Sequence, residues 1–218
     1  SSKSESNRLL IIKSLSDNKI ELENLSDAND TVLLKNLIRS NSQNIWDAED
    51  AGTTMRFLTS FLAVTKQGVL LIGTERMKKR PIKILVDALN KIGAEISYTE
   101  KDGYPPIKIN RKISQIKESI SIRGDISSQY ISSLLMIAPV LPNGLKIDVM
   151  PPFYSKPYVM MTLNLMKKFG IKYDLSEDSI SINNQEYKSG SYKVESDWSA
   201  ASYWYSFISI NKKLKEIN

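Results

Sequence analysis

Residues 52–109, GTTMRFLTSFLAVTKQGVLLIGTERMKKRPIKILVDALNKIGAEISYTEKDGYPPIKI, hold the pattern that decides the fold. Apolar residues recur at helical spacing, then form a short strand-like run, then return to helical spacing before a hairpin-like stretch. The sequence predicts a helix that opens at Gly52, a strand over 68–74, a helix over 81–92 and a hairpin over 94–109. Elements in this order predict an α/β protein.

The same order of elements recurs in the second half of the chain. The corresponding helix, strand, helix and hairpin are predicted over 127–138, 144–150, 156–169 and 171–182. Gly93 and Gly170 follow the second helix of each copy, the position that favours glycine because the backbone turns left-handed there. A looser copy opens the chain, and its helix, strand and helix are predicted over 2–15, 19–25 and 30–40. Such repeats indicate supersecondary units that share one core.

The predicted helices are of two kinds. In the helix of 81–92 the apolar residues keep to one stripe, so its other face is expected to meet water. The segments FLTSFLAV, SSLLMIA and SAASYWYSFI, by contrast, are apolar nearly all round and are predicted to be buried, the aromatic residues of the last one included. The pattern therefore predicts an inside-out lobe of about three βαβαββ repeats, with buried parallel helices and sheets outside. No linker divides the chain, so residues 1–218 are expected to form a single lobe.

Composition excludes several classes of protein. The chain has 218 residues, no Cys and no His, which excludes disulfides, thiolate nucleophiles, catalytic triads with an imidazole base and the usual zinc sites. The longest apolar run, 134–141, is too short to span a bilayer, and the polar N-terminus has no signal-peptide core. We therefore expect a cytoplasmic protein. The net charge of +6 fits either a lysine-rich surface or an anionic partner.

Small polar residues stand at the starts of several predicted helices. The groups are Ser2-Lys3-Ser4, Gly52-Thr53-Thr54, Ser127-Ser128-Gln129 and Ser155-Lys156-Pro157. One such group is an ordinary helix cap. Several of them in equivalent repeat positions would place hydroxyl groups, free N–H groups and helix dipoles at one end of a parallel bundle. With Lys3, Arg8, Arg76 and Arg80 nearby, that end is predicted to bind phosphate.

A second basic cluster, ERMKKRP at 75–81, has two interpretations. It is either a solvated loop before a helix or part of a surface for an anion. No aromatic residue alternates with its cations, so stacking on single-stranded RNA is poorly supported. A non-enzymatic RNA- or phosphate-binding module stays open as an alternative function.

Six motifs in order along the chain are similar to those of a known family. They are SKSESNR, AGTTMRFL, ERMKKRPI with LVDALNKIGA, SSQYISSLL, SKPYVMMTLNLMKKFG and SDWSAASYW. The chain resembles the N-terminal half of the EPSP synthases, which are enolpyruvyl transferases with two lobes of βαβαββ units. The resemblance implies that residues 1–218 are the lobe that binds shikimate-3-phosphate and that the second lobe, with the residues that transfer protons, is absent from this chain. It also implies phosphoenolpyruvate as the second substrate, no metal or organic cofactor, and a monomer.

The resemblance also implies roles for individual residues. Lys3 would touch both substrates and Gln129 would lie between them. The remaining residues implied to bind shikimate-3-phosphate are Ser4, Arg8, Ser127, Ser128, Ser155 and Tyr158, with Arg8 at the carboxylate and the serine pair 127–128 at the 3-phosphate. The phosphoenolpyruvate site would add Gly52, Thr53 and Arg76, with Arg56 and Arg80 as supporting arginines.

Two residues depart from the usual family pattern. Asp50 stands where Asn is common and Phe57 where Pro is common. Because an acid beside an anion site is unfavourable, we expect the side chain of Asp50 to point away. A related enzyme family that transfers enolpyruvyl to UDP-N-acetylglucosamine is the nearest rival; it usually carries a reactive Cys in this lobe, and this chain has none. The motifs SSQ and SKPY favour shikimate-3-phosphate, and we expect neither nucleic acid nor a membrane as partner.

Overall fold

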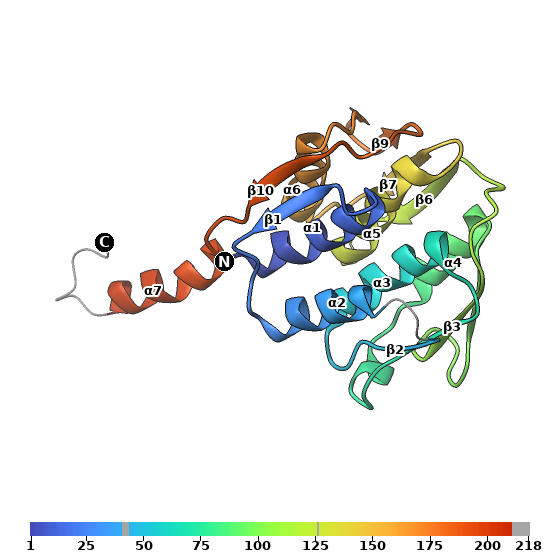
Figure 1. Cartoon of the computed structure of the whole chain (residues 1–218), viewed down its shortest axis with the longest axis horizontal. Coiled ribbons are helices and arrows are strands. Elements are labelled where there is room, and N and C mark those ends of the chain that lie inside the picture. Colours follow the sequence, from blue (N-terminus) through green and yellow to red (C-terminus); the bar gives the residue numbers. More distant parts are fainter. Residues whose placement is uncertain (41–43, 126, 211–218) are drawn as a thin grey trace.

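The computed structural model describes residues 1–40, 44–125 and 127–210 (Figure 1). Its α-helices are α1 (Lys3–Leu15), α2 (Asn29–Arg39), α3 (Gly52–Thr65), α4 (Lys83–Ile92), α5 (Ser128–Ile137), α6 (Lys156–Lys168) and α7 (Trp198–Ile210). Its strands are β1 (Ile20–Glu23), β2 (Ile45–Asp47), β3 (Val69–Ile72), β4 (Glu95–Tyr98), β5 (Ile107–Arg111), β6 (Ser119–Arg123), β7 (Leu145–Met150), β8 (Asp174–Leu175), β9 (Ser179–Ile182) and β10 (Gly190–Lys193). Short 3₁₀ turns, η1 (Met77–Lys79) and η2 (Ala138–Val140), complete the described elements. The helices and hairpins predicted from the sequence are confirmed.

Two sheets have the same four-stranded topology. The strand orders are β2-β3-β5-β4 and β6-β7-β9-β8. In each sheet the first two strands are parallel and the hairpin that follows pairs antiparallel to the second strand. This is the βαβαββ repeat predicted from the sequence, present in two full copies.

The third copy is less complete than the sequence pattern suggested. Strand β1 pairs in parallel with β10, from the far end of the described chain, and α1 and α2 flank β1 in sequence. Within the described residues no antiparallel hairpin extends this two-stranded sheet. The lobe therefore has two full repeats and one partial repeat, in which β1 pairs with β10. Within the described residues this partial repeat has no final hairpin.

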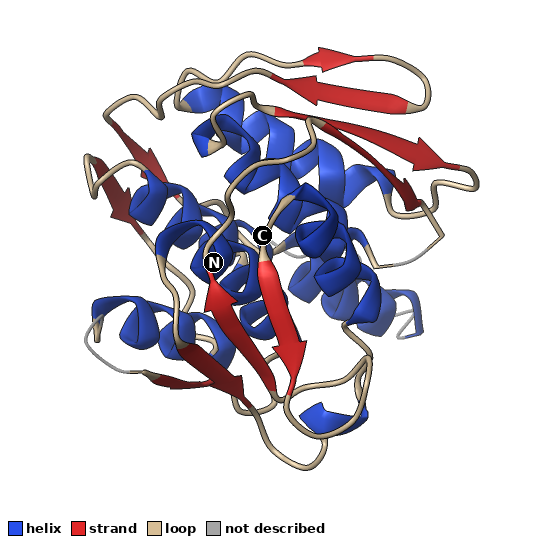
Figure 2. Ribbon diagram, turned by 90° about the vertical axis from the view of Figure 1, so that its right-hand side faces the viewer, coloured by secondary structure: helices blue, strands red, loops and turns tan. Residues whose placement is uncertain are grey.

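The helices lie inside and the sheets outside. Figure 2 shows the helices gathered in the middle of the molecule with the strands around them. Helices α3 and α5 are buried along almost their whole length, as expected for helices that are apolar on all sides. Helix α4 buries only its predicted stripe, which includes Leu85, Leu89 and Ile92. The inside-out α/β architecture is thus confirmed.

Helix α7 is the exception, and the prediction that it is buried was wrong. It extends away from the body of the molecule (Figure 1). Its aromatic residues are exposed: Trp198 by 72%, Tyr203 by 79% and Trp204 by 63%. Burial needs a covering surface, and the path of the chain after β10 carries α7 away from the bundle. Helix α7 has 13 residues and α3, the longest described helix, has 14. None of the described helices is long and apolar enough to cross a membrane.

Candidate functional site

The first turns of the bundle helices meet at one end of the lobe. The side chain of Gln129 at the start of α5 donates to the hydroxyl of Thr53 at the start of α3, with Nε2 and Oγ1 3.0 Å apart. The hydroxyl of Thr54 donates to the backbone carbonyl of Asp30 in α2 at 3.1 Å. The ammonium of Lys3 in α1 lies 3.5 Å from the carboxylate of Asp30. The convergence of helix N-termini predicted from the sequence is confirmed for α1, α3 and α5, and the start of α2, which was not predicted, lies among them.

Arg8 joins α1, α5 and α6 below that end. Its guanidinium donates to the hydroxyl of Thr162 at 2.6 Å, to the carbonyl of Ser4 at 2.8 Å and to the hydroxyl of Ser132 at 3.2 Å. The side chain is 3% exposed, and it also stacks on the ring of Phe57. Burial lowers the pKa of Arg8 to about 10, which still leaves it charged at neutral pH. Its hydrogen-bond acceptors are all neutral; the negative charge of Glu5 acts on it from a distance, but no carboxylate among the described residues forms an ion pair with it.

The start of α5 has a capping hydroxyl group and, beside it, a second hydroxyl group that is largely buried. The hydroxyl of Ser127 accepts the backbone N–H of Gln129 at 3.3 Å, so Ser127 is the N-cap. Ser128 is the first residue of the helix and is 9% exposed. The free N–H groups of this turn and the positive end of the helix dipole therefore lie beside both serine residues.

The start of α6 supplies the fourth polar group. Ser155 precedes the helix without a side-chain cap bond, and Pro157 stands in its first turn. Tyr158 is 43% exposed, while its carbonyl accepts from Thr162 at 2.9 Å and lies 3.5 Å from Arg8. Arg8 thereby ties Ser4 to the Tyr158 turn, and these three predicted site residues lie together.

The start of α3 is bordered by two arginine residues and a cavity of about 410 Å³. Arg56 is 5% exposed and donates to the carbonyls of Gly52 at 3.0 Å and Pro81 at 3.2 Å. The end of the Arg80 side chain lies directly against Gly52. Ser127 and Gln129, at the start of α5, also line this cavity. The cavity therefore connects residues assigned to the two different substrates.

Arg76 lies apart from these groups. It is exposed and stands just before η1, on the loop that joins β3 to α4. It does not line the 410 Å³ cavity and makes no hydrogen bond or ion pair to another described site residue. Its neighbour Lys78 is neutralised by Glu75 and Glu100, each 2.9 Å away, so only part of the basic cluster is available to an external anion.

Asp50 does not simply face away from this loop. Its carboxylate accepts a short hydrogen bond from the hydroxyl of Thr74, at the start of the loop that carries Arg76. The same hydroxyl lies 3.4 Å from the N–H of Met77, the first residue of η1. The acid is therefore occupied by a neutral donor and ties the loop to the start of α3.

Sequence reasoning missed several of these partners. Asp30 forms an ion pair with Lys3, yet in the sequence it is only an acid at the start of an ordinary helix. Ser132 and Thr162 hold Arg8, and here a signal existed, because both are polar residues in helices that bury the surrounding positions. Polar residues inside an apolar helix indicate a buried hydrogen-bond partner, although they do not identify it.

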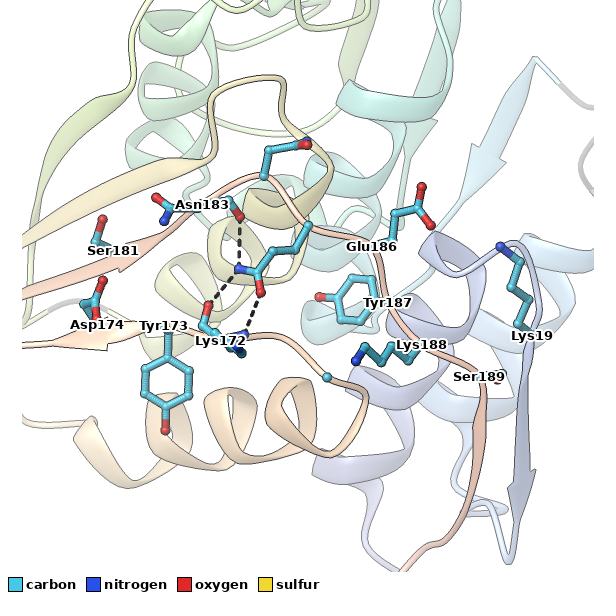
Figure 3. A pocket seen from close by; sticks show the side chains of 13 residues that line it. Lys19, Lys172, Tyr173, Asp174, Ser181, Asn183, Glu186, Tyr187, Lys188 and Ser189 are labelled. Atoms are coloured by element: carbon cyan, nitrogen blue, oxygen red, sulfur yellow. Dashed lines mark hydrogen bonds between the residues drawn. The ribbon is translucent and has the colours of Figure 1, made fainter.

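A larger cavity of about 950 Å³ lies elsewhere, between the β8–β9 hairpin and the segment before β10 (Figure 3). Two of its polar side chains hold backbone segments together. The Gln185 side chain bonds to the backbone N–H and carbonyl of Lys172, each at 2.8 Å, and the Tyr187 hydroxyl donates to the carbonyl of Met136 at 2.8 Å. None of the site residues predicted from the sequence lines this cavity.

Comparison with known proteins gives a consistent result. The family model described as EPSP synthase (3-phosphoshikimate 1-carboxyvinyltransferase) matches residues 34–217. A 3-phosphoshikimate 1-carboxyvinyltransferase of Bacteroides fragilis (strain YCH46) is 47% identical over 212 residues, which are 96% of this chain and 51% of the relative. One from Actinobacillus pleuropneumoniae serotype 3 (strain JL03) is 36% identical over 246 residues, covering 98% of this chain and 56% of the relative.

A solved structure supports the fold. The EPSP synthase from Acinetobacter baumannii, at 2.37 Å, superposes with a TM-score of 0.77 over 93% of this chain and 50% of that one. The sequence identity of 19% makes this a likeness of fold. The chain spans about half the length of the curated relatives that it matches.

Proposed function

The chain belongs to the EPSP synthase family, and on that premise we propose that it forms the shikimate-3-phosphate-binding lobe of an enolpyruvyl transferase. In this reaction the 5-hydroxyl of shikimate-3-phosphate gives up its proton and bonds to C2 of phosphoenolpyruvate, while C3 takes up a proton. The adduct then loses inorganic phosphate and a C3 proton, which leaves the enol ether. Residues 1–218 contribute binding and orientation, as one lobe.

The observation that carries this proposal is the buried, unpaired charge of Arg8. A guanidinium that is 3% exposed and bonded only to neutral acceptors is unfavourable without an anion nearby. Its attachment to Ser4 and to the Tyr158 turn places it beneath the meeting helix N-termini. A carboxylate bound above it would complete the charge pair, and the carboxylate of shikimate-3-phosphate has that role in this proposal.

Residues at the helix starts would bind the rest of shikimate-3-phosphate and the second substrate. Ser127 and Ser128 would hold the 3-phosphate, with Ser155 and Tyr158 beside it. The helix dipole and free N–H groups favour a phosphate at this position. Lys3, Gly52, Thr53 and Arg76 would bind phosphoenolpyruvate. Gln129, which is hydrogen-bonded to Thr53, would lie between the two substrates and hold them in the orientation that the reaction needs.

Proton transfer is assigned to groups outside the described residues. Two acids at these helix starts already have partners, because Asp30 is engaged by Lys3 and Asp50 by Thr74. The role of this lobe is therefore to bind and align both polyanions, and we propose the groups that protonate C3 on the second lobe of the family.

Titration of the purified chain tests the proposal. We expect shikimate-3-phosphate to bind at least about tenfold more tightly than shikimate, because the phosphate adds charge-assisted hydrogen bonds. UDP-N-acetylglucosamine should not compete, and mixing both substrates should release no phosphate. Equal binding of every phosphorylated ligand with a steep salt dependence would instead support a general phosphate- or RNA-binding module. Phosphate release that requires shikimate-3-phosphate would contradict the assignment of proton transfer to the second lobe.

Replacing the two serine residues at the start of α5 separates scaffold from site. Ser127→Ala removes the N-cap and should lower the free energy of unfolding by about 1 kcal/mol. Ser128→Ala removes no cap bond, so we expect it to destabilise the chain less than Ser127→Ala does. It should still weaken shikimate-3-phosphate about tenfold and leave shikimate unchanged. Urea unfolding and calorimetric titration measure both effects; equal weakening of the two ligands by Ser128→Ala would place the hydroxyl away from the phosphate.

A further inference from the structure

The guanidinium of Arg80 is seated on the first residue of α3. A Cβ atom added to Gly52 would lie 2.3 to 2.5 Å from Nη2, Nη1 and Cζ of Arg80, so only glycine leaves room for it there. Nη1 also lies 3.3 Å from the carbonyl of Asp50. These contacts hold the end of a long side chain in one place at the positive end of a helix.

A second guanidinium lies beneath the first. Arg56 is fixed by the carbonyls of Gly52 and Pro81 and stacks on the ring of Tyr130, with its Cζ 5.9 Å from the centroid. Its buried Nε has no hydrogen-bond partner among the described residues. Burial lowers the pKa of Arg56, and the adjacent positive charge of Arg80 lowers it further. Two like charges therefore lie close together, one of them buried and the other partly exposed.

The nearby carboxylates form no ion pair with these two arginines. The carboxylate of Asp50 accepts from Thr74, while Nη1 of Arg80 donates to the Asp50 carbonyl. Lys83, which lines the same cavity, forms ion pairs with Asp87 at 3.7 Å and Asp102 at 3.4 Å. Among residues 1–40, 44–125 and 127–210, neither Arg56 nor Arg80 forms an ion pair. A pre-positioned pair of guanidinium groups at a helix N-terminus, open to a cavity of about 410 Å³, is suited to a phosphate group.

We propose that Arg80, supported by Arg56, is a direct phosphate-binding residue of this lobe. Resting on the proposed function, the bound group is the phosphate of phosphoenolpyruvate and, after transfer, the inorganic phosphate that is released. Arg76 is exposed on its loop and does not line the cavity. Arg80 is already in place, because Gly52 leaves it room and the Asp50 carbonyl accepts from it. Arg80 therefore provides the pre-organised charge of the site.

Titration of inorganic phosphate into the full chain tests this proposal. Arg80→Gln should weaken phosphate binding about tenfold or more, measured with and without saturating shikimate-3-phosphate so that the 3-phosphate position is filled in one arm. Lys79→Gln is the matched control, because it removes the same charge from the adjacent, exposed position. It should change the affinity less than twofold. Equal effects of the two variants would reduce the role of Arg80 to general electrostatics and overturn the proposal.

A double-mutant cycle tests whether Arg80 binds phosphate from its position against Gly52. Gly52→Ala places a methyl group where the Arg80 guanidinium lies, so it should displace the end of that flexible side chain and weaken phosphate binding as Arg80→Gln does. In the Arg80→Gln background the same methyl group should have little further effect. An equal loss in both backgrounds would mean that the methyl group acts on the ligand directly, and the proposed seat would be wrong. Thermal unfolding of each variant confirms that the chain is folded.

The outcomes also separate this proposal from the proposed function. If Arg80→Gln weakens phosphate binding while shikimate-3-phosphate does not bind the unmodified chain, the role of Arg80 is supported and the assigned substrate is wrong. If shikimate-3-phosphate binds and Arg80→Gln leaves the affinities for phosphate and phosphoenolpyruvate unchanged, the role of Arg80 is wrong and the proposed function is retained.

Discussion

Arg8→Met is expected to remove most of the affinity for shikimate-3-phosphate without destabilising the unliganded chain. Losing a buried charge-assisted pair should cost about 2–4 kcal/mol of binding free energy, or roughly 30- to 700-fold in affinity. Stability should be unchanged or slightly higher, because the variant no longer buries a cation without an ion-pair partner. Thr162 and Ser132, whose hydroxyls lie 2.9 Å apart, can still bond to each other. Urea unfolding and calorimetric titration give the two quantities.

Two further variants make this result specific. Arg39→Met makes the same change at an exposed position at the end of α2 and should affect neither quantity appreciably. Arg8→Lys keeps the charge but loses the planar fork, so it should recover only part of the affinity. A large loss of stability in Arg8→Met together with unchanged binding would make Arg8 a structural residue and remove the main support for the proposed function.

Gly93→Ala is expected to destabilise the lobe by about 2–5 kcal/mol, a large part of the stability of a domain. Gly93 ends α4 with a φ of +112°, which a residue with a Cβ adopts at a cost of about 1–2 kcal/mol. The added methyl group would also lie 2.0 Å from the carbonyl oxygen of Ser114. That segment cannot easily move, because the N–H groups of Ser114 and Ile116 are bonded to Gly93 and Ile92. Overpacking of this kind costs about a further 1–3 kcal/mol.

Gly68→Ala is the matched control for this prediction. Gly68 also has a positive φ, of +71°, but a Cβ there would meet nothing within 4 Å. Only the backbone cost of about 1–2 kcal/mol should remain. The difference between the two variants in urea unfolding measures the contact with Ser114. Equal destabilisation by both would mean that the 113–116 segment yields to the methyl group and does not pack rigidly on the end of α4.

Local patterns in the sequence determined much of the architecture. The all-round apolar helices α3 and α5, the one-sided helix α4, and the hairpins of 94–109 and 171–182 were all predicted correctly, because periodicity reports how many faces of an element avoid water. The helix ends at Gly93 and Gly170 were predictable for a similar reason: both have positive φ, which glycine alone adopts readily. The polar starts of the helices, finally, followed from cap chemistry and the repeat.

The tertiary structure decided which groups meet across the repeats. Periodicity shows that α7 is apolar on all sides but does not show what covers it, and in the structure it is exposed. The sequence likewise ranked Arg76 above Arg80, because a side chain's neighbours are not encoded in its own motif; only the packing of the loop on α3 puts Arg80 against Gly52. Arg8 meets Thr162 across 154 positions of chain. Contacts over such separations depend on how all the helices pack together, and local propensity carries no information about that arrangement.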